Sequence, residues 1–232
     1  MAGPMAQYTN EMRNKFGYFA AWTPSHPFKL GDYGILKKSV FRRLANVVDL
    51  GISFETRVQN SKANLKYATE GAITETITLA GEAVPVGSVL GKADAGIIVK
   101  FGKKDSVLFE VNGYKTNFIA NITRLGDDIR NKSGQGPWDR DWLVITELII
   151  ADSATILISS SNQGLIELKA NAELKPAELN IASLNAQFQS VNSRDLSVQI
   201  VAQEGITPLF HLWGIGGFRE EFQPTAAAMP GV

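Results

Sequence analysis

The chain has 232 residues, of which 44% are hydrophobic and 20% charged, with 23 basic and 23 acidic side chains and no cysteine. This length fits one large domain of roughly 200–250 residues. The absence of cysteine excludes disulfides, thiolate metal sites and cysteine nucleophiles. No apolar run reaches the roughly 20 residues of a membrane-spanning helix, and the N-terminus lacks the layout of a signal peptide, so we expect a cytoplasmic protein.

The charge is unevenly distributed along the chain. Residues 1–66 hold ten basic and four acidic side chains, and residues 67–232 hold the other thirteen and nineteen. This asymmetry indicates either that the N-terminal third meets an anionic partner or that the two parts complement each other within the fold.

The N-terminal elements are short. Polar residues 6–15 predict a helical turn, and the aromatic run over 16–22 is typical of a strand that the prolines after it end. A turn and a short strand are predicted over 30–36.

The segment 37–50 is predicted to be a basic helix that Gly51 ends. Its apolar residues recur at helical spacing, at Val40, Phe41, Leu44, Val47 and Val48. Several of its charges share the opposite face, and they come from Lys37, Lys38, Arg42 and Arg43.

After this segment the pattern alternates with a period of two, which is typical of strands. Alternation is found over 52–58 and is clearest over 72–79. The segments 95–101 and 106–111 are predicted to form a hairpin through the turn Gly102-Lys103-Lys104-Asp105.

The second half of the chain continues in the same way. Residues 115–130 have helical apolar spacing. Residues 142–150 predict the strongest strand, which continues over 155–159 after a brief break and is expected to pair with 165–170. Residues 178–190 fit a helix or a strand.

Further strands are predicted over 197–202 and 208–213. We therefore predict an α+β fold, a twisted and mainly antiparallel sheet with two or three short helices. Residues 1–213 are expected to form a single domain, and residues 214–232 a loose tail with a regulatory role left open.

No catalytic residues stand out. The chain has two histidines, His26 and His211, and both are interpreted as packing or surface residues. The acidic residues Asp127, Asp128, Asp139, Asp141 and Glu147 are interpreted as solvated ends and local ion pairs. We expect no metal, no cofactor and no enzymatic activity.

The basic segment is the most suggestive feature. A helix with Lys37, Lys38, Arg42 and Arg43 on one face and apolar residues on the other fits an anionic membrane surface. It is also the layout of any surface helix that covers a core, which is the commoner case. The patch is small and no nucleic-acid-binding motif accompanies it, so we do not expect a nucleic-acid partner.

The segment from Gly96 to Ile158 combines a hairpin over 96–111, a helix over 115–130 and a strand that begins Asp141-Trp142-Leu143-Val144-Ile145-Thr146-Glu147-Leu148. This order resembles the pore-forming domain of the gasdermins, in which a similar valine-rich strand follows a helix. The early basic helix also has a counterpart in that family, where it meets acidic lipid.

The resemblance implies a pore-forming protein that oligomerises on anionic membrane lipid, moving from the cytoplasm to the membrane on activation, with an activating protease left open. It implies lipid binding by the four basic residues, and hairpins over 72–79 and 96–111 that extend and insert. The compact bacterial members are similar in length and are silenced by a short C-terminal segment, which residues 214–232 would provide. The alternative is a non-enzymatic soluble structural or protein-interaction domain that assembles through sheet edges.

Overall fold

The computed structural model describes residues 3–61, 63–136, 138–170, 179, 181, 188–216 and 221–225. The described residues form two α-helices, a short 3-10 helix and fourteen strands in two antiparallel sheets. The predicted α+β class with a mainly antiparallel sheet is confirmed.

The first half of the chain forms α1 (Pro4–Phe16), β1 (Phe19–Ala20), β2 (Asp32–Lys37), β3 (Val40–Asn46), the 3-10 helix η1 (Val47–Leu50), β4 (Thr56–Ser61), β5 (Leu65–Ala68), β6 (Ile73–Thr78), β7 (Gly96–Phe101) and β8 (Val107–Ile119). The second half forms α2 (Ile122–Gln135), β9 (Leu143–Ser159), β10 (Leu165–Ala170), β11 (Phe188–Arg194), β12 (Leu196–Gln203), β13 (Leu209–Gly216) and β14 (Glu221–Pro224). None of the helices in the described residues is both long and apolar enough to cross a membrane.

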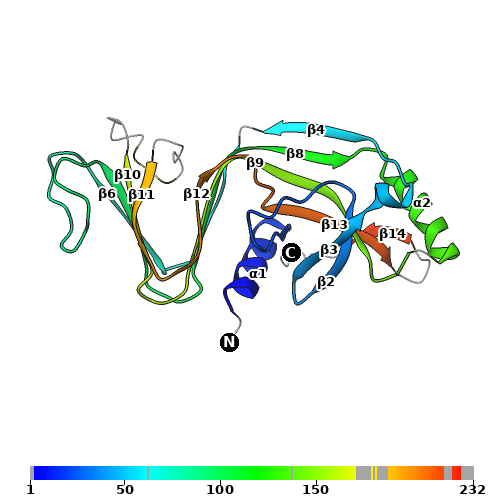
Figure 1. Ribbon diagram of the computed structural model, residues 1–232, viewed down its shortest axis with the longest axis horizontal. Coiled ribbons are helices and arrows are strands. Elements are labelled where there is room, and N and C mark those ends of the chain that lie inside the picture. Colours follow the sequence, from blue (N-terminus) through cyan, green and yellow to red (C-terminus); the bar gives the residue numbers. More distant parts are fainter. Residues whose placement is uncertain are drawn as a thin grey trace. The chain divides into compact units, whose positions relative to one another are not determined.

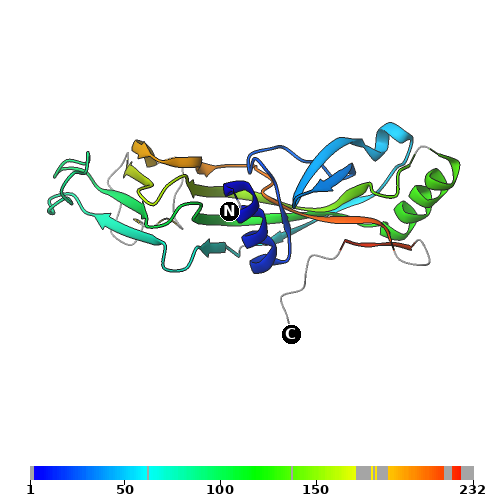
Figure 2. The ribbon, with the colours of Figure 1, turned by 90° about the horizontal axis from the view of Figure 1, so that it is seen from below.

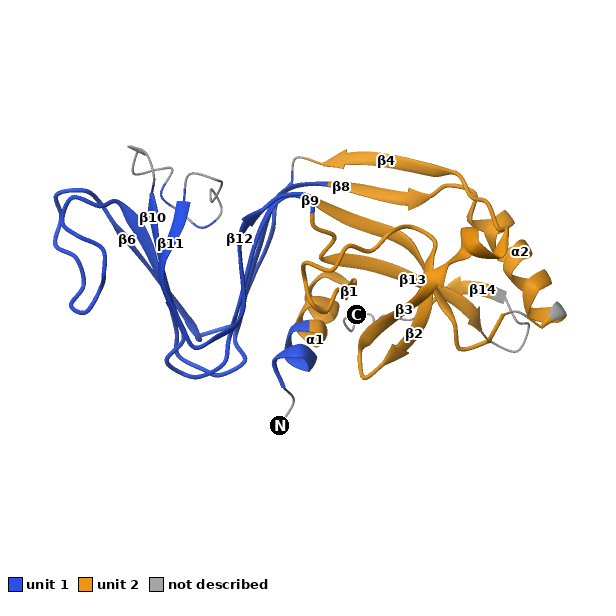
Figure 3. Cartoon of the chain, in the orientation of Figure 1, with its two compact units in different colours: residues 1–8, 62–114, 151–205 blue, residues 9–61, 115–150, 206–232 orange. Residues whose placement is uncertain are grey.

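The chain divides into two compact units, which Figure 3 shows in different colours. Unit 1 comprises residues 1–8, 62–114 and 151–205, and unit 2 comprises residues 9–61, 115–150 and 206–232. Strands β8 and β9 each contribute to both units. Strand β14 lies within residues 214–232, for which the sequence predicts a loose tail after a single domain over 1–213.

Unit 1 is a sandwich of two four-stranded layers. One layer is the separate sheet, in which the strands lie in the order β6, β7, β10 and β11. The other layer contains β5, β8, β9 and β12, in which β8 pairs with β5 and β9, and β9 pairs with β12. The two layers therefore have corresponding strand orders, because β5, β8, β9 and β12 are continued along the chain by β6, β7, β10 and β11.

Four short segments connect the corresponding strands, and we call them together the crease: residues 69–72, 102–106, 160–164 and 195. Figure 1 shows the unit 1 strands bending sharply at this place. Each segment carries the chain from one layer to the other. Unit 1 is thus a four-stranded antiparallel sheet folded across a single line.

The register of the two central strand pairs is unbroken through the crease. In one layer the amide of Phe101 donates to the carbonyl of Gly164 at 2.8 Å, and Leu165 lies opposite Lys100. In the other layer the amide of Ser159 donates to the carbonyl of Ser106 at 3.0 Å. Phe101 and Ser106 are five residues apart on one strand, and Ser159 and Gly164 are five residues apart on the other. The two long strands therefore stay aligned while they bend.

The inner faces of the two layers form the core of unit 1. Its buried side chains come from both layers and include Ile97, Val99, Phe101, Leu108, Leu157, Ile166 and Leu168. Burial of such a set stabilises the folded unit by roughly 25 cal/mol for each Å² of apolar surface removed from water. This apolar contact holds the two layers together.

Unit 2 contains a sheet with the strand order β1, β13, β9, β2 and β3. Its core includes three phenylalanines, Phe28, Phe41 and Phe210, whose ring centroids lie 5.2–5.7 Å from one another. Buried side chains of α2, Leu125 and Ile129, belong to the same core. The β13–β14 pair lies beside α2, as Figure 1 and Figure 2 show.

The predicted helix over 37–50 is wrong, because the segment contains a β-hairpin. Strands β2 and β3 pair from Asp32 opposite Asn46 to Lys37 opposite Val40. Lys38 and Ser39 form the turn with positive φ values of 50° and 64°, as the tightest hairpin turns require. Only residues 47–50 are helical, and Gly51 caps them as predicted.

Two predicted hairpins are also wrong, although their strands are correctly placed. Strand β7 pairs with β6 and β10 rather than with β8. Strand β10 pairs with β7 and β11 rather than with β9. The expected hairpin turns at 102–105 and 160–164 instead belong to the crease. The ambiguous segment 178–190 lies largely outside the described residues, and its end begins β11.

Candidate functional site

The four basic residues singled out from the sequence lie on the hairpin of residues 32–46, which we call the basic hairpin. Lys37 ends β2 and Lys38 begins the turn, and both side chains are exposed. Arg42 is exposed on β3, opposite Ile35. Among the described residues, none of these three cations has a carboxylate partner, so they present positive charge to the solvent.

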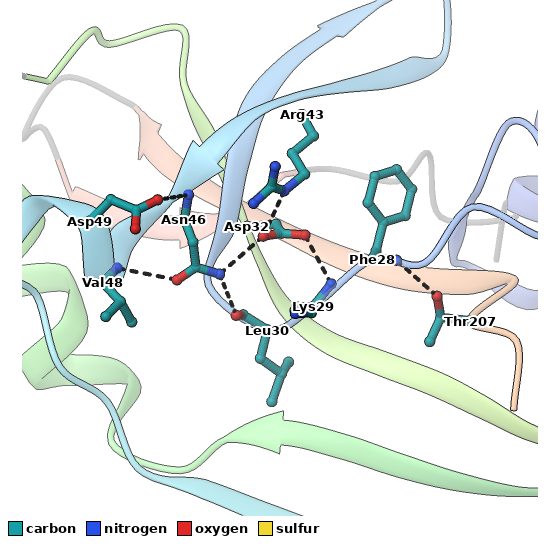
Figure 4. A network of polar contacts seen from close by, with 9 residues as sticks. All are labelled: Phe28, Lys29, Leu30, Asp32, Arg43, Asn46, Val48, Asp49 and Thr207. Atoms are coloured by element: carbon teal, nitrogen blue, oxygen red, sulfur yellow. Dashed lines mark hydrogen bonds and ion pairs between the residues drawn. The ribbon is translucent and has the colours of Figure 1, made fainter.

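Arg43 has a different role from the other three. Its Nε atom donates to Oδ1 of Asp32 at 2.9 Å, and the Asp32 side chain is only 1% exposed. The same carboxylate accepts from the amide of Lys29 at 2.9 Å and from Nδ2 of Asn46 at 3.0 Å. Figure 4 shows these contacts converging on Asp32. Arg43 therefore joins β3 to Asp32 of β2, while its side chain stays 41% exposed.

Asn46 extends this network to the end of the hairpin. Its Nδ2 atom also donates to the carbonyl of Leu30 at 2.9 Å, and its Oδ1 atom accepts from the amide of Val48 at 3.1 Å. The amide of Asn46 in turn donates to the Asp49 carboxylate at 3.0 Å. This reciprocal cap fixes where the strand ends and the 3-10 helix begins.

Replacing Asp32 with alanine is expected to lower the free energy of unfolding by about 2–3 kcal/mol, because it removes a buried carboxylate with three donors. Urea unfolding measures this change. Replacing Asp127, an exposed partner of Arg130, is the matched control and is expected to cost less than about 0.5 kcal/mol. Equal losses for the two variants would contradict the role assigned to Asp32.

Exposed apolar side chains accompany the basic hairpin. Leu44 is 50% exposed and Val48 is 59% exposed. Leu44 is the extra residue of a bulge, because Tyr33 lies opposite Ala45 while Gly34 lies opposite Arg43. The bulge is accompanied by a close approach of the two strands, since a Cβ at Gly34 would lie 1.9 Å from the Arg42 carbonyl oxygen.

The second polar cluster of unit 2 contains His211, which the sequence did not connect with other residues. The Tyr18 hydroxyl donates to Oε1 of Glu147 at 2.5 Å, and Nδ1 of His211 lies 3.6 Å from the same oxygen. The Tyr18 and His211 rings stack at 3.9 Å. Burial acts to raise the pKa of Glu147, but the interactions with His211 and Tyr18 outweigh it, and the pKa lies below its ordinary value.

This cluster is a row across β13 and β9, in which His211 lies directly opposite Glu147. The tyrosine precedes β1, the neighbour of β13. Cross-strand rows of this kind stabilise a sheet. Within the described part of the chain, no group of three or more histidine, cysteine, aspartate or glutamate side chains is arranged to hold a metal ion.

The other candidates have local explanations. The His26 ring packs edge-on against Phe28 at 4.7 Å. Asp127 forms an ion pair with Arg130, and Asp139 accepts from the amide of Asp141 at 2.9 Å. A pocket of about 320 Å³ lies between α2 and the β13–β14 pair, and its lining includes Arg130, which Asp127 neutralises.

The crease is the functional candidate that the sequence analysis missed. It joins two layers of corresponding strand order, and the central strands keep one register through it. The available signal was the presence of polar turns at 102–105 and 160–164, each between two strand-like apolar stretches. A comparison with models of protein families found no match, and a search of curated proteins found none either.

Proposed function

We propose that this protein is a membrane-active pore former that oligomerises on anionic lipid, with the architecture that the gasdermin resemblance implies. The observation that carries the proposal is the crease, which allows the two layers of unit 1 to become one sheet. The basic hairpin supplies the attraction to the membrane surface.

Straightening the crease converts eight strands into four long ones, without changing the order of neighbours. The joined segments run from β5 through β6, from β7 through β8, from β9 through β10 and from β11 through β12. Each exceeds the roughly 9–11 residues that a strand needs to cross a bilayer. The central pair already has a common register, so its hydrogen bonds need not be exchanged.

The inner face provides apolar surface for the membrane. Residues Ile97, Val99 and Phe101 face Leu108 and Leu157 across the closed sandwich. After opening, these side chains lose their partner layer and must be covered by other apolar groups. Phe101 and Leu108 are seven residues apart, so the two sets share one face of the opened sheet only if the crease retains one residue as a bulge. Lipid chains provide that cover, while the backbone groups of the sheet remain paired with one another.

The edges of the opened sheet favour assembly with further copies. A sheet of four antiparallel strands has edge strands that run in opposite directions. A second copy placed beside it in the same orientation therefore continues the antiparallel pattern. Such head-to-tail contacts close into rings when the rotation between copies permits.

Charge reversal at the tip of the basic hairpin is expected to weaken binding to anionic vesicles. Removing a lysine near an anionic surface costs about 1 kcal/mol, so Lys37→Glu with Lys38→Glu should reduce binding by at least about 30-fold. Co-sedimentation with vesicles containing phosphatidylserine measures this. The matched control is Arg57→Glu with Arg124→Glu, two exposed cations of unit 2 outside the basic hairpin. Equal losses for the two pairs would contradict a specific role for the hairpin.

The proposal is also tested by dye release from the same vesicles. If neither the full chain nor a version ending near Trp213 releases dye, the pore function fails. The second candidate, a soluble domain that assembles through sheet edges, is favoured by the edge position of β6, whose residue Ile77 is 47% exposed. Assembly in solution without lipid, measured by light scattering, would support that candidate instead.

The proposed location is cytoplasmic before activation and membrane-bound after it. In this proposal the segment after Trp213 is the regulatory tail. It includes β14, in which Phe222 packs on Trp213 with ring centroids 5.5 Å apart and fills the space beside Gly126. A protease acting near this segment would release β14 from β13.

A further inference from the structure

The inner face of the unit 1 sandwich contains a buried ion pair. Lys66 of β5 lies directly opposite Glu110 of β8. The Lys66 Nζ atom is 2.7 Å from Oε1 of Glu110, and the glutamate side chain is 1% exposed whereas the lysine side chain is 55% exposed. The negative charge is therefore buried while the positive charge remains half in water.

The pair lies between the two layers. Glu110 is two residues beyond Leu108, so it projects from the same face of β8 as this core residue. Glu75 of β6 lies opposite the core residue Val99 and places its Oε1 atom 4.0 Å from Lys66 Nζ. Lys66 thus contacts a carboxylate of each layer.

The contacts of the Glu110 carboxylate offset only part of the free-energy cost of burying its charge. Within the described part of the chain, its Oε2 atom has no hydrogen-bond partner. Burial raises the pKa of Glu110, and the interaction with Lys66 offsets this only in part. Removing a charge from water is costly, and replacing a buried ion pair with well-packed hydrophobic side chains of similar volume is often neutral or stabilising.

We propose that the Lys66–Glu110 pair makes the closed sandwich less stable than a neutral pair would, and thereby favours opening at the crease. This inference rests on the proposed function, because it assigns a role to opening. Glu110 lies two residues beyond Leu108, a unit 1 core residue of β8, at the end of the apolar inner face. Separation of the layers therefore exposes Glu110 to water or lipid headgroups. Its burial cost is then relieved in the open state only.

The test replaces both charges with unbranched hydrophobic side chains of similar length, as Lys66→Met with Glu110→Met. The closed state should become more stable, so we expect the midpoint of thermal unfolding to rise by at least about 3 °C and the rate of dye release to fall about tenfold. The single change Lys66→Met leaves Glu110 without its main cation. It should act in the opposite direction, lowering the midpoint and accelerating release.

The matched control is Arg130→Gln with Asp127→Asn. These residues of α2 form an ion pair outside the strands that are proposed to open, and their side chains are 43% and 53% exposed. Neutralising this pair should leave the release rate within about twofold of the wild type, because an exposed pair contributes little. An equal slowing in the control would overturn a specific role for Glu110.

The remaining outcomes separate this inference from the proposed function. A lower midpoint for the Lys66 and Glu110 double variant would overturn the inference, because the pair would then stabilise the closed state. A wild-type release rate in that variant would also overturn it. If the wild type releases no dye, the pore function fails, and the midpoint alone decides whether the buried pair is destabilising.

Discussion

A disulfide across the crease, made by Ser159→Cys with Gly164→Cys, is expected to abolish dye release from anionic vesicles, and its reduction to restore it. The closed structure suits this bond, because a Cβ at Gly164 would lie 3.1 Å from the Cβ of Ser159, close to the roughly 3.5–4.5 Å of disulfides. In a straight strand the same residues would be about 17 Å apart. The bond is therefore compatible only with the bent chain.

The absence of native cysteine makes this experiment specific, since no other thiol can form a disulfide within the chain. Each single-cysteine variant is a control for the substitution itself. This control matters at Gly164, where an added Cβ also lies 3.1 Å from the Asp195 carbonyl oxygen. We expect less than about one-tenth of the wild-type release under oxidising conditions. Undiminished release by the oxidised protein would rule out opening of this strand.

Replacing Gly34 with alanine is expected to destabilise the basic hairpin severely. The new Cβ would lie 1.9 Å from the carbonyl oxygen of Arg42 and 2.8 Å from its carbonyl carbon. Both are backbone atoms of the paired strand, so no side-chain rotation relieves the contact. Overpacking of this kind costs about 3 kcal/mol, which corresponds to a fall of about 6–12 °C in the unfolding midpoint for a chain of this size.

The matched control is Gly134→Ala in α2. An added Cβ there meets nothing within 4 Å, and alanine favours the helical backbone over glycine by about 0.5–1 kcal/mol. This variant should be as stable as the wild type or more so by differential scanning calorimetry. If Gly34→Ala unfolds at the wild-type temperature, the close approach of β2 and β3 is wrong. The Gly34 variant should also bind anionic vesicles more weakly, because the basic hairpin positions Lys37 and Lys38.

Several strands could be predicted from local pattern. The alternation over 72–79 corresponds to β6, and the apolar stretches beginning at 142 and 165 correspond to β9 and β10. The helix predicted over 115–130 was correct in type but displaced, since β8 continues to Ile119 and α2 begins at Ile122. The boundary depends on the amide of Ala120, which donates to the distant Glu55 carbonyl at 2.8 Å.

The error at residues 37–50 has a specific cause. Apolar residues at Val40, Phe41 and Leu44 satisfy helical spacing, but they are also compatible with a strand that contains a bulge. The choice depends on distant partners, because Phe41 packs against Phe28 and Phe210. The ion pair of Arg43 with Asp32 spans the two strands. Spacing along one segment contains no information about these contacts.

The sequence by itself determined that this protein is a β-rich α+β chain, that most of its strands lie where alternation occurs, and that no cysteine chemistry is available. These properties depend on composition and on the two-residue period of a strand, which are local. Only the tertiary structure decided which strands pair, that two apparent hairpin turns form the crease, and that Arg43 pairs with Asp32 while Lys37 and Lys38 do not pair with a carboxylate of the described residues. Strand pairing depends on which distant faces bury each other, and the same alternating segment can pair with more than one partner.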